Sequence, residues 1–299
     1  MDNTFAGVVV GYDATPQSEL ALTWAVETAR RTGQEVLLVH TLHVDVLTPM
    51  APIEPFEWMP DGDLAGPGPD APAVDRATAA LGPGRVHLSR SVGSAAQQLI
   101  EASRTASLVV TGSRGRGTFA AGILGSTAYF VAAHAHCPVV VVRAEPQAAE
   151  PPMPDPDHKV VVGIEDVEGS GHILDVAAAL AADRRAPLQV VRVRLIPPAD
   201  MWGFSPGPGS DAQMNEAMEL YTERVMSAAV ARVRGRHPQL SVQASAFHGD
   251  PGHLLARQSQ GAGIVVVGSR GRGGFAGLLL GSVSHDLIHQ ATCPVMIVR

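Results

Sequence analysis

The sequence has almost no lysine and few aromatic residues. Its 299 residues include a single lysine, Lys159, and aromatic residues make up 4%. No Gly-Lys-Ser/Thr triplet occurs, which excludes the P-loop of NTPases, and no strand carries the lysine that a protein kinase needs. A site for an anionic ligand must therefore use backbone amides, helix dipoles, arginines or a bound divalent cation.

Cysteine is also scarce, and long apolar runs are absent. Cys137 and Cys293 precede two similar apolar segments, which favours two separate buried thiols over a disulfide, the alternative interpretation. No apolar run approaches the roughly 18–20 residues of a membrane span, and the first residues lack the basic region of a signal peptide. The net charge of −7 argues against nucleic acid as the main partner. We expect a cytoplasmic protein that binds neither nucleic acid nor membrane.

A glycine-rich segment occurs twice. Residues 112–127 read GSRGRGTFAAGILGST, residues 268–283 read GSRGRGGFAGLLLGSV, and eleven of the sixteen aligned positions are identical. Both copies have the pattern Gly-x-x-Gly, nine residues, Gly-Ser, and both follow a β-branched apolar run that is typical of a buried parallel strand. A glycine loop after such a strand lets backbone N–H groups approach an anion closely. The segment predicts a phosphate-binding loop in two copies.

The rest of the chain repeats at nearly the same interval. Residues 8–13 (VVVGYD) return as 160–165 (VVVGIE), and residues 137–143 (CPVVVVR) return as 293–299 (CPVMIVR). Two homologous domains of ordinary size therefore account for the chain. The expected first domain, proline-rich linker and second domain span residues 1–144, 145–158 and 159–299.

Strand and helix patterns alternate in each half. The strands expected in the first half lie near residues 7–12, 35–41, 85–90, 107–112 and 138–143. The expected helices are 18–31, 72–81, 94–104 and one from about 126, with a long helix at 211–234 in the second half. The alternation predicts an α/β fold with two tandem doubly wound domains, each an open five-stranded parallel sheet with helices on both faces. A ligand would sit at the carboxyl ends of the strands.

The first helix has a candidate N-cap and an apolar stripe. Ser18 is the expected N-cap. Leu20, Trp24, Val26 and Ala29 are expected to form the buried stripe.

A long loop follows the second strand of each half. Residues 45–75 and 196–210 are rich in proline and glycine, and they contain Trp58-Met59 and Met201-Trp202. Either each tryptophan packs its loop onto the domain, or the loops form a lid or a partner surface.

The glycine pattern, the acidic residue after the first strand and the duplication resemble the universal stress protein family over essentially all 299 residues. Members that bind ATP carry this glycine pattern, and tandem members have two such domains in one chain. The resemblance implies a Rossmann-like fold, related to adenine nucleotide alpha hydrolases, with adenosine across the ends of strands 1, 2 and 4. It also implies ATP as the ligand and pairing of the domains through their last strands. We expect Mg²⁺ with the ATP because the triphosphate meets no lysine.

In the first domain, the resemblance implies that Asp13 meets the adenine and that the backbone of Thr41 reads the adenine edge. Gly11 lies where a side chain would obstruct the nucleotide. The glycine loop and the start of the helix that follows it hold the ribose and the phosphates. The expected ATP-binding residues here are Gly11, Asp13, Thr41, Gly112, Ser113, Arg114, Gly115, Arg116, Gly117, Gly125, Ser126 and Thr127.

In the second domain, Glu165 replaces the usual aspartate, and its extra methylene is expected to shift or weaken the contact with adenine. The arginines of both loops either supply positive charge or are solvated loop charges. The expected ATP-binding residues here are Gly163, Glu165, Val193, Val267, Gly268, Ser269, Arg270, Gly271, Arg272, Gly273, Gly281, Ser282 and Val283.

The sequence gives little support for a metal site or for catalytic residues. His285 and His289 have the i, i+4 spacing of a metal pair, but the glutamate of a zinc protease motif is missing, so a surface or interface pair is the better interpretation. No Ser-His-Asp or Cys-His arrangement repeats between the halves, and no catalytic residue or protein metal ligand is expected.

Three functions fit the sequence. The chain could be an ATP-dependent regulator or sensor in stress response or growth arrest, a slow ATPase, or an interaction scaffold that uses ATP only structurally. The missing Walker lysine argues for poor hydrolysis, so we favour the regulator, which is not an enzyme. A homodimer and an unidentified protein partner are further expectations.

Overall fold

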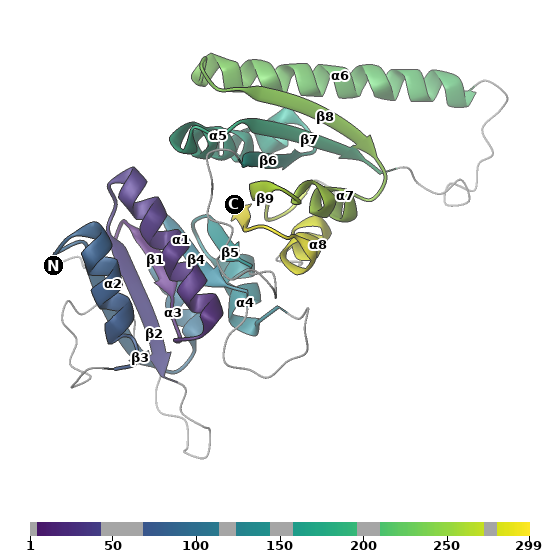
Figure 1. Ribbon diagram of the computed structural model, residues 1–299. Helices are drawn as coiled ribbons and strands as arrows, with labels where there is room; N and C mark the ends of the chain where they lie inside the picture. The colour runs from purple at the N-terminus through teal and green to yellow at the C-terminus, as the bar shows by residue number, and fades with distance from the viewer. Residues whose placement is uncertain (1–4, 43–67, 114–123, 144–157, 196–209, 272–279) are drawn as a thin grey trace. The chain divides into compact units, whose positions relative to one another are not determined.

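The computed structural model describes residues 5–42, 68–113, 124–143, 158–195, 210–271 and 280–299 (Figure 1). The chain divides into two compact units, residues 1–153 with 292–299, and residues 154–291. Each unit is an α/β structure with a mostly parallel sheet, as the sequence predicts.

The first unit has the strand order β3-β2-β1-β4-β5-β10. Its strands are β1 (Val8–Gly11), β2 (Val36–Leu42), β3 (Val86–Val92), β4 (Leu108–Gly112), β5 (Val139–Val142) and β10 (Val295–Val298). Its helices are α1 (Pro16–Thr32), α2 (Ala71–Leu81), α3 (Ala95–Ala102) and α4 (Ser126–His134). The central strands are almost wholly buried, so their valine runs form the core.

The last strand of the second repeat belongs to the first unit. β10 runs antiparallel to β5, with Met296 opposite Val140. Arg299, which follows β10, donates a hydrogen bond to the carbonyl oxygen of Ala132 at 3.2 Å. The expected pairing of the two last strands is therefore confirmed.

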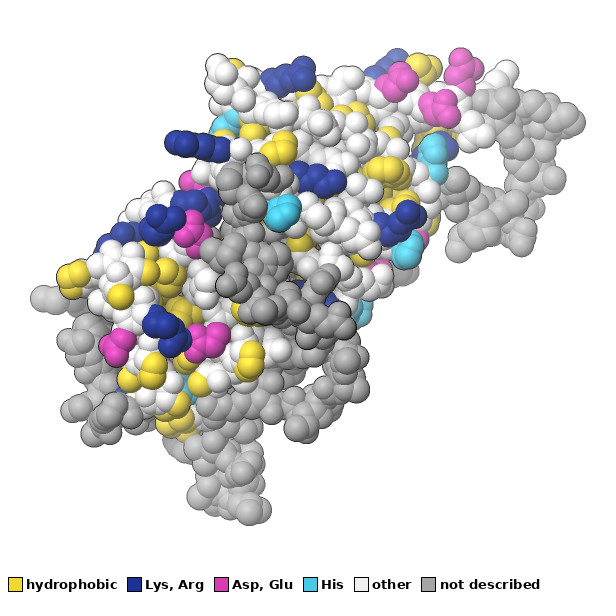
Figure 2. Space-filling view, viewed as in Figure 1, with side chains coloured by type: hydrophobic (Ala, Val, Ile, Leu, Met, Phe, Trp, Pro, Cys, Tyr) yellow, Lys and Arg dark blue, Asp and Glu magenta, His cyan; other side chains and the backbone are white. Residues whose placement is uncertain are grey.

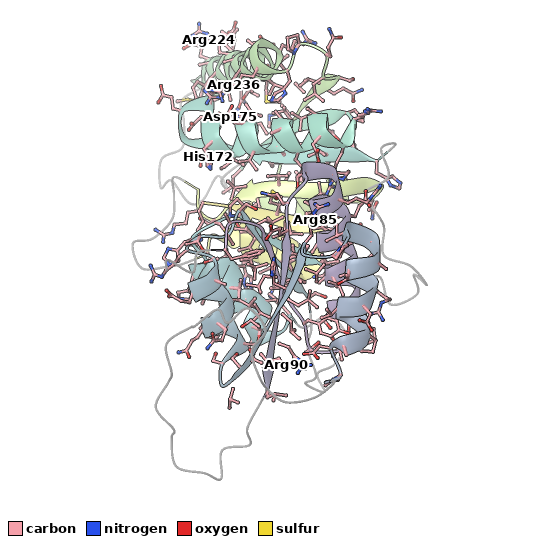
Figure 3. The ribbon with its side chains drawn as sticks, turned by 90° about the vertical axis from the view of Figure 1, so that its left-hand side faces the viewer. Arg85, Arg90, His172, Asp175, Arg224 and Arg236 are labelled. Carbon is pink, nitrogen blue, oxygen red and sulfur yellow. The ribbon has the colours of Figure 1, made fainter. Side chains whose placement is uncertain are left out.

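The second unit has the strand order β9-β6-β7-β8. Its strands are β6 (Lys159–Ile164), β7 (Leu188–Arg194), β8 (Val242–His248) and β9 (Ala262–Gly268). Its helices are α5 (Val167–Arg184), α6 (Ser210–Arg236), α7 (Pro251–Gln258) and α8 (Ser282–Gln290). Asp175 on α5 accepts two hydrogen bonds from Arg232 on α6, at 2.8 and 2.7 Å, and also contacts Arg236 (Figure 3).

Helix α1 begins earlier than the sequence predicts. Thr15 is the N-cap, and Ser18 is the third helical residue of a capping box: Thr15 Oγ1 accepts from the Ser18 N–H at 3.3 Å, and Ser18 Oγ accepts from the Thr15 N–H at 3.0 Å. The prediction of Ser18 as N-cap is wrong because Pro16 supplies a first helical residue with the required φ. The predicted stripe is also only partly right, since Trp24 is buried but Leu20 is half-buried.

Both cysteines are buried thiols that are not joined in a disulfide, as expected. Burial raises the pKa of Cys137 to about 11, so its thiol is a poor nucleophile. Among the described residues, no helix combines the length and apolar character that crossing a membrane would require.

Candidate functional sites at the glycine loops

The expected site residues of the first unit lie where three parallel strands end. β1 lies between β2 and β4, with Gly11 opposite Val39 and Val10 opposite Val110. Asp13 follows β1, and Gly112 ends β4. The strands run in the same direction, so these residues reach one edge of the sheet, the edge at which ligands bind in such folds.

Gly11 and Gly163 serve the packing of the core. A Cβ on Gly11 would lie 2.9 Å from Cδ1 of Leu99, and a Cβ on Gly163 would lie 2.8 Å from Cδ1 of Leu255. Both leucines are almost fully buried on the helices α3 and α7. In the structure, the missing side chain of each glycine allows a close contact between helix and strand. The sequence analysis had explained Gly11 by the space that the nucleotide needs.

Gly112 permits a close approach of the backbone. A Cβ there would lie 2.8 Å from the carbonyl carbon and oxygen of Gln17, in the first turn of α1. In the second unit, a Cβ on Gly268 would lie 2.6 Å from Cδ1 of Ile173 on α5. Each glycine loop thus starts directly beside the helix that follows the first strand of its unit.

A hydrogen bond closes each glycine loop at its base. Gly125 N–H donates to the carbonyl oxygen of Ser113 at 2.8 Å, and Gly281 N–H donates to that of Ser269 at 2.7 Å. The bonds are equivalent because both pairs are offset by 156 residues.

Six expected loop residues lie outside the described residues: Arg114, Gly115, Arg116, Gly117, Arg272 and Gly273. The same holds for both Trp–Met pairs, at 58–59 and 201–202.

The helices after the loops start without a capping side chain. Gly125 and Gly281 are the N-caps of α4 and α8, and neither helix has a side-chain cap hydrogen bond. Ser126 and Ser282 are exposed in the first turn, and Thr127 and Val283 are half-buried. An N-terminus of this kind presents amide N–H groups and a positive dipole end to an anion.

Asp13 is held by the cap of α1. Its Oδ1 accepts hydrogen bonds from Thr15 Oγ1 at 2.6 Å and from the Thr15 N–H at 3.2 Å. Thr41, near the end of β2, pairs with Ser91 on β3, and their hydroxyl oxygens lie 3.3 Å apart. Asp13 is therefore fixed at the sheet edge as an acceptor beside the first loop.

Glu165 is held differently in the second unit. Its N–H donates to Ser170 Oγ at 3.3 Å, and its carbonyl oxygen accepts from Arg192 Nε at 3.0 Å. Its side chain extends to the second loop, where Oε2 lies 3.2 Å from the position of a Cβ on Gly271. Val193 pairs with Phe247 along β7 and β8. Val267 is buried just before the loop.

Arg192 is a site residue that the sequence analysis missed. It is only 8% exposed; its Nη1 donates to Thr222 Oγ1 at 2.6 Å, and its guanidinium carbon lies 5.3 Å from the ring centroid of Tyr221. In the sequence, the only sign of this role is that Arg192 is a charged residue in an otherwise mostly apolar strand. Arg192 therefore links Thr222 on α6 to the backbone of Glu165 in the candidate site.

The equivalent strand position in the first unit, His40, belongs to a buried ionic cluster that the sequence analysis also missed. Asp70 is fully buried and binds His40 Nδ1 at 2.8 Å and Arg90 through Nε at 2.9 Å and Nη2 at 2.5 Å. Burial raises the pKa of Asp70, but the hydrogen bonds from Arg90 and His40 outweigh it and hold the pKa below its usual value. The cluster fixes the end of β2 to the start of α2.

A tyrosine packs beside this cluster. Tyr12 meets His40 edge to face, and its hydroxyl donates to Glu19 Oε1 at 2.5 Å. Burial and the carboxylate of Glu19 raise the pKa of Tyr12 to about 12, so the phenol stays protonated. It is a structural donor and not a base at neutral pH.

The other candidate chemistry gains no structural support. The ring centroids of His285 and His289 lie 4.5 Å apart with the rings tilted by 49°, and among the described residues no group of three or more His, Cys, Asp or Glu side chains could hold a metal ion. On the face drawn in Figure 2, basic and acidic side chains of the described residues are interspersed.

Comparisons with protein-family models, with curated sequences and with solved structures each found proteins similar to this chain. The model of the family described as "Universal stress protein family" matches residues 5–143 and 158–299. Universal stress proteins Rv2005c and Rv2623 of Mycobacterium tuberculosis are 33% and 31% identical over 300 residues. These alignments cover 98% and 99% of this chain, and 97% of each relative. A solved structure from Pseudomonas aeruginosa PAO1, described as functionally unknown, has a TM-score of 0.67 at 15% identity and covers 98% of this chain and 92% of its own. The chain therefore belongs to the universal stress protein family and carries two tandem domains of that family.

Proposed function

We propose that this chain is an ATP-binding regulator whose nucleotide occupancy changes its contacts with a partner protein during stress or growth arrest. The observation that supports the proposal most is the repeated loop geometry. In both units, a glycine loop is closed by an equivalent hydrogen bond and leads into a helix without a side-chain cap. Such a loop and helix start suit a polyphosphate.

The proposed ATP sites use the residues expected from the sequence, one site in residues 1–144 and one in 159–299, with 145–158 as linker. The backbone amides that follow Gly125 and Gly281 in the first turns of α4 and α8, and the exposed hydroxyls of Ser126 and Ser282, would hold phosphate oxygens. Asp13 would face the nucleoside end from the end of β1, whereas the carboxylate of Glu165 would lie on the phosphate side, at the second glycine loop.

Mg²⁺ suits this set of donors as part of the nucleotide complex. The cation supplies positive charge to the phosphates, and hard oxygen ligands are what it prefers. The carboxylate of Glu165 at the second loop is a suitable oxygen ligand. The only lysine, Lys159, begins β6 and does not belong to either loop.

Rapid hydrolysis is not expected. Phosphoryl transfer needs positive charge on the transferred group and an oriented nucleophile, and equal binding of ground and transition states does not accelerate the reaction. Asp13 already accepts two hydrogen bonds from Thr15, and Tyr12 is held protonated, which leaves neither suited to act as a general base. We therefore expect turnover well below ~1 s⁻¹, the low end of typical enzymes.

The test is to incubate the purified full chain with ATP and Mg²⁺, remove free nucleotide, denature it and identify the released ligand by mass spectrometry over time. Release of intact ATP after minutes supports the regulator. ADP that forms within seconds, and no longer forms when Gly115→Asp and Gly271→Asp are combined, would overturn the regulator in favour of a true ATPase. Failure to retain any nucleotide contradicts both.

A further inference from the structure

The carboxylate of Glu165 projects from a fixed position in the second unit. The backbone N–H of Glu165 donates to Ser170 Oγ, and its carbonyl oxygen accepts from Arg192 Nε. Arg192 is itself held by Thr222 and lies against Tyr221. Both backbone polar groups are thus anchored, so the side chain starts from a defined point beside the second glycine loop.

From that point the carboxylate reaches the glycine loop itself. Oε2 lies 3.2 Å from where a Cβ of Gly271 would be, and Gly271 is the second glycine of the Gly-x-x-Gly pattern. The loop's proposed ligand is an anion. A negative charge of the protein therefore stands at the place where the phosphates would approach.

The first unit differs at two positions that bear on this geometry. Thr15, which binds the carboxylate of Asp13, corresponds to Val167, which has no hydroxyl. Arg192 corresponds to His40, which binds Asp70. Asp13 is also one methylene shorter than Glu165. The carboxylate of Asp13 is therefore held at the start of α1, whereas the carboxylate of Glu165 extends to the second glycine loop.

We propose that Glu165, positioned by Arg192, makes the second site selective for a nucleotide that carries a divalent cation, whereas the first site also accepts the free nucleotide. This inference rests on the proposed ATP binding. Without a cation, the carboxylate and the polyphosphate repel each other, which should weaken binding by about 10-fold or more. With Mg²⁺ or Mn²⁺, the same carboxylate becomes an oxygen ligand of the cation.

The experiment is calorimetric titration of the full chain with ATP, in EDTA and in MgCl₂. For the wild type we expect about two sites of similar affinity in MgCl₂. In EDTA one site should keep its affinity and the other should weaken by about 10-fold or more. Glu165→Gln should bind two free ATP molecules in EDTA. Glu216→Gln, which removes the same charge from the exposed face of α6, should behave as the wild type.

The outcomes separate the inference from the proposed function. Two equal sites in EDTA for the wild type would overturn the inference and leave ATP binding intact. A second site that stays weak in Glu165→Gln would also overturn it. Absence of binding in both buffers would overturn the proposed function itself.

A second readout tests the positioning role of Arg192. Lysine keeps the positive charge but loses the planar Nε–H that holds the Glu165 carbonyl oxygen. Arg192→Lys should reduce the ratio of second-site affinities measured in MgCl₂ and in EDTA. An unchanged ratio would show that Arg192 does not position Glu165.

Discussion

The N–H of Gly125 donates to the carbonyl oxygen of Ser113 at 2.8 Å and closes the first glycine loop at its base. Gly281 and Ser269 form the same bond at 2.7 Å in the second unit. These four residues lie at the ends of buried strands and at helix starts. Substitutions inside the loops should therefore alter ligand binding more than folding.

The first prediction follows from this closure. Gly115→Asp and Gly271→Asp place a side chain and a negative charge where phosphates would lie. Each should lower the ATP affinity of its own site by at least ~10-fold, or about 1.4 kcal/mol, while the other site is kept. Calorimetry would show one strong site per chain in each variant. Gly235→Asp, at a position on α6 with no atom within 4 Å of an added Cβ, is the control and should keep both sites. Full affinity in the doubly substituted loop variant would exclude the loops as the phosphate site.

Gly112 should behave differently, because its neighbour is backbone. A methyl group there would lie 2.8 Å from the carbonyl group of Gln17, so the start of α1 or the end of β4 has to move. We expect Gly112→Ala to lower the free energy of unfolding by about 1–3 kcal/mol. Gly235→Ala, in the open on α6, should raise it by about 0.5–1 kcal/mol. Urea denaturation measures both, and equal effects would contradict the close approach at Gly112.

Acid should weaken the first unit through Asp70. The pKa of this carboxyl group is lowered in the folded state, so its stabilisation is complete above the unfolded value of about 3.9 and is lost as the pH falls through the folded value. Asp70→Asn should lower the free energy of unfolding by about 3 kcal/mol at pH 7. The side chain of Arg90 is only 13% exposed, and the substitution removes its carboxylate partner. The variant should also lose less stability than the wild type between pH 5 and pH 3. Asp75→Asn, exposed on the same helix, should change neither quantity.

The sequence predicted the fold class because a duplicated pattern of apolar strands and glycine loops constrains it in two independent copies. Strand positions agree within a few residues, since buried β-branched runs such as 108–110 have few alternatives. The roles of Arg192 and His40 were not predictable, because each depends on partners distant in sequence, Thr222 and Asp70. The packing role of Gly11 was hidden for the same reason: it depends on Leu99.

Removal of β10 should expose the edge of β5. All four residues of β5 are buried, and β10 pairs with three of them. A fragment of residues 1–144 should therefore dimerise or aggregate, because an unpaired apolar edge recruits another strand. The same fragment with residues 292–299 joined through a flexible linker should self-associate less, because β10 then covers the edge of β5. Light scattering distinguishes the two, and a stable monomer of 1–144 would contradict the role of β10.

The central claim is that two equivalent glycine loops bind ATP, one in each half of the chain. Calorimetric titration of the full chain with ATP in MgCl₂ tests it most directly. The two loops share their base hydrogen bond and their uncapped helix start, so the account predicts saturation near two ATP molecules per chain. Absence of any measurable binding would contradict it.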